Sequence, residues 1–150
     1  MIGIYLIGAF SIALVLFLNR NKMITFILLG IFLALQGTLT FHAWANLHST
    51  EWSYFTYDSL GILLLVTLSI ISVPAILHSH IYLEDQPAPP QSRAIYYAAY
   101  VLLLSAISAG YLSNHIAVTW IFTEITTLSA SALIYHHRNK LALEGTWKYV

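Results

Sequence analysis

The chain has 150 residues, of which 59% are hydrophobic and 8% charged, whereas an ordinary soluble domain carries about 25% charged residues. A water-soluble fold of this length could not bury so much apolar surface, so the composition predicts an all-α integral membrane protein whose helices satisfy their own backbone groups in lipid. The zero net charge argues against nucleic acid as a partner, and the absence of cysteine excludes disulfides and thiolate-bound metals.

Five apolar segments follow one another, each near the roughly 20 residues that a helix needs to cross the hydrocarbon of a bilayer. They cover residues 2–18, 23–45, 60–83, 94–112 and 116–135, and a sixth helix is expected to start near Thr146. The sequence therefore predicts a single membrane domain over residues 1–150, a bundle of about five transmembrane helices plus the start of a sixth. We expect a multi-pass protein of a bacterial or archaeal inner membrane.

The basic residues alternate between the loops. The second and fourth loops contain no Lys or Arg, whereas the first, third and fifth contain Arg20, Lys22, Arg93, Arg138 and Lys140. Because Lys and Arg accumulate in short cytoplasmic loops, this distribution predicts an N-terminus outside the cytoplasm.

Two residues carry local predictions for the third segment. Asp58 directly precedes it and is interpreted as an N-cap, whose carboxylate accepts hydrogen bonds from the amides of the first turn; the alternative is a role in a proton path. Pro74 lies inside the segment and removes one backbone hydrogen bond, which favours a kink.

Glu124 is the one ionisable residue deep inside an apolar segment. A charge at the centre of a bilayer costs from about 2.5 to more than 10 kcal/mol, so such a residue normally faces protein or water and serves ion movement. Thr127 and Ser131 follow at i+3 and i+7 and share its helical face. This pattern favours Glu124 as a proton-carrying carboxylate; the alternative is a protonated side chain that hydrogen-bonds between helices.

Lys148 and the histidines are weaker candidates. Taken alone, Lys148 near the start of the sixth helix is expected to extend its ammonium group to the interface. His136 and His137 lie beside basic residues in the fifth loop, where they are interpreted as interfacial polarity or as a proton entry, because histidine titrates near neutral pH. A b-type haem needs axial histidines on two helices at matching depth. Since the histidines map to helix ends and loops, no cofactor or metal is expected.

Two stretches near the C-terminus resemble a known pattern. Residues 120–128 read WIFTEITTL and residues 143–150 read LEGTWKYV, which is similar to the W-x-x-x-E-x-T-T-L and L-E-x-x-W-K-Y motifs of antiporter-like, proton-translocating subunits. Such subunits occur in respiratory complex I, the NADH–quinone oxidoreductase, and in group 4 membrane-bound hydrogenases. The chain looks most like the F-type subunit of hydrogenase-4. Residues 58–61, DSLG, also resemble the opening of the third helix in this family.

The resemblance implies a non-redox, proton-translocating subunit of a redox-driven complex, without a cofactor and not catalytic alone. In this family a glutamate on the fifth helix and lysines on later helices relay protons along the middle of the membrane. Glu124 matches that glutamate, and Lys148 matches the lysine at the start of the sixth helix. The alternative is a structural or assembly subunit of such a complex, which docks partners and does not conduct.

A full antiporter-like subunit has about fourteen helices in two inverted repeats, more than this chain provides. The resemblance therefore implies partners among the other membrane subunits of a complex I-like or hydrogenase assembly, including one that supplies the missing helices. Both a split subunit and a fragment of a longer product are compatible with this expectation. The coupled ion, a proton or sodium, stays open at this point.

Overall fold

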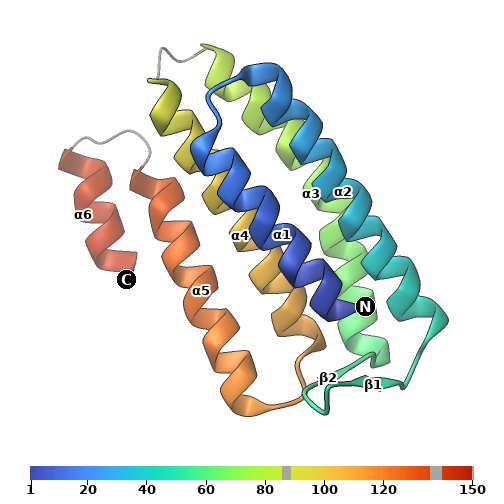
Figure 1. The fold of residues 1–150 in the computed structure, drawn as a ribbon. Helices are drawn as coiled ribbons and strands as arrows, with labels where there is room; N and C mark the ends of the chain where they lie inside the picture. The colour runs from blue at the N-terminus through green and yellow to red at the C-terminus, as the bar shows by residue number, and fades with distance from the viewer. Residues whose placement is uncertain (86–88, 136–139, 150) are drawn as a thin grey trace.

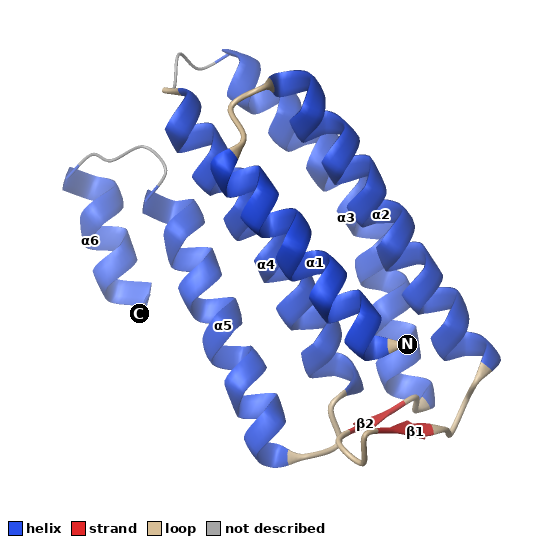
Figure 2. Cartoon of the chain, in the orientation of Figure 1, coloured by secondary structure: helices blue, strands red, loops and turns tan. Residues whose placement is uncertain are grey.

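The computed structural model describes residues 1–85, 89–135 and 140–149. Within these residues the chain forms a bundle of helices with a short two-stranded hairpin at one end (Figure 1, Figure 2). In chain order the elements are α1 (Ile2–Leu18), α2 (Lys22–Ala45), β1 (Thr50–Glu51), β2 (Phe55–Thr56), α3 (Ser59–Asp85), α4 (Pro90–Leu112), α5 (Ile116–Ile134) and α6 (Lys140–Tyr149).

Four of the described helices, α2 to α5, are long and apolar enough to cross a membrane, and α1 is a shorter apolar helix of 17 residues. Large apolar side chains cover the outside of the bundle; Ile7, Phe41 and Ile116, for example, are 68%, 77% and 86% exposed. Soluble monomers do not expose contiguous apolar surface on this scale, whereas lipid solvates it. The prediction of an all-α, multi-pass membrane protein is therefore confirmed.

Helix α4 occupies the centre of the bundle. It packs against α1, α3 and α5, while α2 packs against α1 and α3 (Figure 1). Small residues are typical of contacts between membrane helices, because they let the backbones approach closely. On α4 the small buried residues are Ser92, Ala94, Ala98, Ala99, Ser105, Ala106, Ser108 and Ala109.

Gly61 marks a close approach between the start of α3 and the end of α4. A Cβ at this position would lie 2.6 Å from the Tyr111 carbonyl oxygen and 2.5 Å from Asp58 Oδ1. Asp58 Oδ1 accepts a hydrogen bond from the Gly61 amide at 3.2 Å, which confirms the predicted N-cap of α3. The helix then continues through Pro74 without interruption.

Two helices begin at least four residues earlier than predicted. Helix α4 begins at Pro90 and not at Ala94, because proline suits the first helical position, where its missing N–H is not needed. Helix α6 begins at Lys140 and not near Thr146. Its first turns contain Lys140 and Glu144, and this polarity hides the start of the helix from a hydropathy pattern.

The segment between α2 and α3, expected to be a loop, contains the hairpin. Thr50 pairs with Thr56 and Glu51 pairs with Phe55. The turn holds Trp52 and Ser53 at φ values of 55° and 60°, a left-handed conformation that normally favours glycine or asparagine. Since neither residue type stands there, the sequence contains no turn signal for this hairpin.

Candidate functional site

Helix α5 has one packed side and one open side. Phe122 lies on the packed side: its Cβ is 3.9 Å from the position that a Cβ on Gly110 of α4 would take, and its ring centroid is 6.1 Å from that of Phe55. Ser129 is also buried. Over the most apolar part of the helix, 6% of the α5 residues are buried, against 56% for α4. One side of α5 is therefore open to whatever surrounds this chain.

Glu124 lies on the open side of α5. It is the ninth of the 19 residues of the helix, close to its middle. Each residue advances an α-helix by about 100°, so Glu124 points away from Phe122, two residues earlier. Its side chain is exposed, and no described residue forms a hydrogen bond or ion pair with it. Among the described residues, no charged group lies in contact with this carboxyl group.

Thr127 and Ser131 lie one and two turns after Glu124 on the same side of the helix. Their hydroxyls donate hydrogen bonds to the carbonyls of Thr123 at 2.9 Å and Leu128 at 2.8 Å. A hydroxyl that donates still has lone pairs that accept. The open side of α5 therefore carries a polar stripe of one carboxyl group and two hydrogen-bond acceptors.

Lys148 lies on α6, which runs back along α5 (Figure 1). Glu124 lies 10 residues, or about 15 Å of helix, before the last residue of α5. Lys148 lies 8 residues, or about 12 Å of helix, after the first residue of α6. Because α6 runs back along α5, the two residues lie at similar distances from this end of the helix pair. Lys148 Nζ lies 2.6 Å from Glu144 Oε1 in an exposed i, i+4 ion pair. His136 and His137 lie outside the described residues.

A buried polar network that the sequence reasoning missed joins α1, α2, α3 and α4. The Gln36 amide nitrogen donates to Ser108 Oγ at 3.0 Å and Ser69 Oγ at 3.3 Å, and its carbonyl oxygen accepts from the Tyr5 hydroxyl. Thr40 Oγ1 lies 2.8 Å from Ser69 Oγ. The signal for this network in the sequence is a single amide inside the apolar run of α2. The groups are uncharged, so they are suited to holding helices together.

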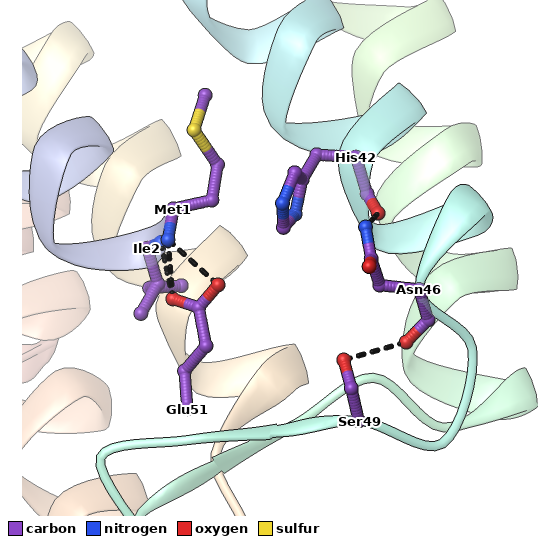
Figure 3. Close-up of polar contacts among 6 residues, drawn as sticks. All are labelled: Met1, Ile2, His42, Asn46, Ser49 and Glu51. Carbon is purple, nitrogen blue, oxygen red and sulfur yellow. Dashed lines mark hydrogen bonds and ion pairs between the residues drawn. The ribbon is translucent and has the colours of Figure 1, made fainter.

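A second polar cluster closes the hairpin end of the bundle (Figure 3). Glu51 Oε2 lies 2.5 Å from the N-terminal ammonium of Met1 and 2.9 Å from the Ile2 amide nitrogen, so the hairpin caps helix α1. Burial opposes ionisation of Glu51, but hydrogen bonds from the ammonium and the Ile2 amide outweigh it and lower the pKa of this carboxyl below its ordinary value. Nearby, the Asn46 side chain donates to the His42 carbonyl at 2.9 Å.

Three of the described histidines lie at or near helix ends. His115 Nδ1 accepts from the Ala117 amide at 3.3 Å and caps α5. His80 Nδ1 lies 3.8 Å from Glu84 Oε2, and His42 lies in the last turn of α2. Within residues 1–85, 89–135 and 140–149, no three His, Asp or Glu side chains gather in a way that could hold a metal ion.

Comparison with known proteins gives one informative similarity. The chain is 29% identical over 101 residues to a hydrogenase-4 component F homolog of Methylacidiphilum infernorum (isolate V4). The matched region covers 65% of this chain and 21% of the relative, so the chain spans about a fifth of the length of that curated protein. No family model and no solved structure matches the chain. This similarity, at low identity, supports the resemblance to antiporter-like subunits of hydrogenases and complex I.

Proposed function

We propose that this chain is a membrane subunit of a hydrogenase-type, complex I-like assembly and that Glu124 carries protons within it. The position of Glu124 is the observation on which the proposal depends. The residue lies in the middle of a membrane-spanning helix, on a side that the described part of the chain leaves uncovered.

Lipid is an unfavourable neighbour for this side chain. An acidic or basic group at the bilayer centre costs about 2.5–3.5 kcal/mol on insertion scales, and such residues almost always face a bundle interior or a water-filled cavity. Thr127 and Ser131 continue the polarity along the same side of α5. We infer that another membrane polypeptide covers this side in the assembled protein and encloses Glu124 with water or a counter-ion.

The proposed identity of the assembly rests on the similarity to the hydrogenase-4 component F homolog. That relative is a component F homolog of hydrogenase-4, and this chain corresponds to about a fifth of its length. A relay along the membrane needs further helices with further charged groups. The partner we propose is therefore the neighbouring membrane subunit that supplies those helices.

Lys148 is the proposed second group of the relay. It starts from a depth similar to that of Glu124 and forms an ion pair with Glu144. A cation that moves toward a carboxyl group stabilises its ionised form and so releases the proton, and a cation that moves away allows the proton to return. We propose that Lys148 exchanges between Glu144 and the Glu124 side of α5, and that His136 and His137, which precede α6 in the sequence, serve proton entry.

The proposed orientation places the N-terminus outside. Arg20, Lys22 and Arg93 line one cleft. The α1–α2 loop and the start of α4, which carry these residues, lie at the end of the bundle opposite the hairpin (Figure 1). Under the positive-inside rule this end faces the cytoplasm, and the hairpin faces the other side.

The test is Glu124→Gln in the intact complex, which keeps the size of the side chain and removes its ability to ionise. We expect normal assembly and electron transfer, with proton translocation reduced to background. Asp85→Asn is the matched control, because it removes a carboxylate from the last residue of α3 and should leave translocation unchanged. Unchanged translocation in a normally assembled Glu124→Gln complex would contradict the proton role and favour an assembly subunit.

A further inference from the structure

A cleft of about 90 Å³, which we call the basic cleft, opens at the end of the bundle opposite the hairpin. It lies between the α1–α2 loop, the end of α3 and the start of α4. Arg20, Lys22 and Arg93 line it, and Glu84 is the one carboxylate among the described residues of its lining. The cationic side chains therefore outnumber the acidic one in this described lining.

The loop that carries the first two cations is fixed by its own hydrogen bonds. The Asn19 side chain donates to the Asn21 carbonyl at 3.1 Å and to Thr25 Oγ1 at 3.4 Å, and Asn19 Oδ1 accepts from the Asn21 amide at 3.1 Å. The Asn21 side chain also caps helix α2. The backbone that carries Arg20 and Lys22 is thus fixed beside the cleft, so a ligand would not have to order this loop.

The wall formed by α4 adds a hydroxyl group. Tyr97 follows Arg93 by one helical turn, lines the cleft and is 6% exposed. A phenol can donate a hydrogen bond to an anionic oxygen. His80 also lines the cleft, and its Nδ1 lies 3.8 Å from Glu84 Oε2.

Exposed apolar surface adjoins the basic cleft on its membrane side. The Phe26 ring lies 5.5 Å from the ring of His80, which lines the cleft, and Phe26 is 51% exposed. Ile81, the next residue after His80, is 61% exposed. The cleft lies where α2 and α4 begin, at the level where membrane helices meet the headgroups. An occupant of this place meets cations at one end and apolar side chains at the other, which fits an amphiphile better than a free anion.

We propose that the basic cleft binds the phosphate headgroup of an anionic phospholipid, with Arg20, Lys22 and Arg93 around the phosphate and an acyl chain along Phe26. Guanidinium groups bind phosphate oxygens in a bidentate manner, and the ammonium acts as a point charge. Basic pockets between membrane helices on the cytoplasmic side bind such headgroups. The site is independent of Glu124 and would stand if the proton role failed.

The experiment measures lipid retained by the purified full chain. Native mass spectrometry would compare phosphatidylglycerol with phosphatidylcholine, added at equal concentration, for the wild type and for Arg20→Gln, Lys22→Gln and Arg93→Gln. We expect the wild type to prefer phosphatidylglycerol, and each substitution to weaken that preference by about fivefold, which corresponds to about 1 kcal/mol for each basic residue near an anionic surface. Lys140→Gln, at the first residue of α6, is the matched control and should keep the preference.

Three results would overturn the proposal: no preference in the wild type, an equal loss in Lys140→Gln, or inorganic phosphate displacing the lipid at constant ionic strength. Circular dichroism of each variant confirms that it is folded. If a Gln variant does not fold, the matching Arg→Lys or Lys→Arg change takes its place and should retain the preference for phosphatidylglycerol, whereas loss of that preference would count against the site.

Discussion

Phe122 and Glu124 lie on opposite sides of helix α5. Phe122 packs against the bundle core beside Gly110, and Glu124 projects from the surface of the chain at mid-helix. A helix that packs one side with aromatic and small residues and exposes a carboxyl group on the other behaves as an interface helix. We therefore expect the two sides to respond differently to substitution.

Glu124→Leu should favour insertion of the isolated chain and abolish proton translocation in the complex. On insertion scales, leucine at a helix centre is more favourable than an acidic residue by roughly 3 kcal/mol. The inserted fraction of α5 in a glycosylation-based insertion assay measures this gain. Thr123→Leu, at the preceding and also exposed position, is the control and should give a smaller gain. An equal effect of the two changes would show that Glu124 is not unfavourable in lipid.

Gln36→Ala should destabilise the bundle by about 1–3 kcal/mol, because it leaves the hydroxyls of Tyr5 and Ser108 without their amide partner in a buried site. Denaturant unfolding followed by circular dichroism measures the loss. Thr38→Ala on the same helix removes an exposed hydroxyl that donates to the Leu35 carbonyl and should change stability by less than about 0.5 kcal/mol. Comparable losses in both variants would mean that the network contributes little.

Gly61→Ala should separate the start of α3 from the end of α4, because the new Cβ would lie 2.6 Å from the Tyr111 carbonyl oxygen. Overpacking of this kind costs about 1–3 kcal/mol. Gly30→Ala is the control: apart from the backbone of its own helix, no atom of the described residues lies within 4 Å of a Cβ there. Alanine also favours a helix interior over glycine by about 1 kcal/mol. The melting temperature should fall for the first variant and hold or rise for the second. The reverse order would contradict the close approach.

The stability of the hairpin end should depend on pH, because Glu51 ionises there. Its pKa is lowered from the ordinary value of 4.5, so the carboxylate stabilises the folded state above that value and this contribution is lost as the pH falls through the lowered pKa. Thermal unfolding should show the wild type a few degrees more stable than Glu51→Gln at pH 7. The difference should shrink as the pH falls below 4.5 and through the lowered pKa of Glu51. A difference that stays constant over this acid range would exclude ionisation of Glu51 as its cause.

The class of fold could be predicted from the sequence, because long apolar segments leave few alternatives for a chain with so few charges. The cap at Asp58 was also predictable, since a carboxylate before a helix has one common role. These features depend on residues that are close together in the sequence, so the sequence alone is enough to predict them.

Other features depend on contacts between distant segments. The Glu51 contact with Ile2 spans 49 residues, and the Gln36 contact with Ser108 spans 72 residues. The hairpin turn uses Trp52 and Ser53 in a left-handed conformation that their residue types do not signal. Each of these features depends on how the segments pack in three dimensions. The contrast between the packed and open sides of α5 depends on the same packing.

The most direct test asks what lies against the polar stripe of α5 in the assembled membrane. The chain contains no cysteine, so Thr127→Cys introduces a single thiol, which can carry a photoreactive group one turn from Glu124. Irradiation of native membranes should yield an adduct with a second membrane polypeptide. Adducts with lipid alone would contradict the claim that protein covers this side of the helix.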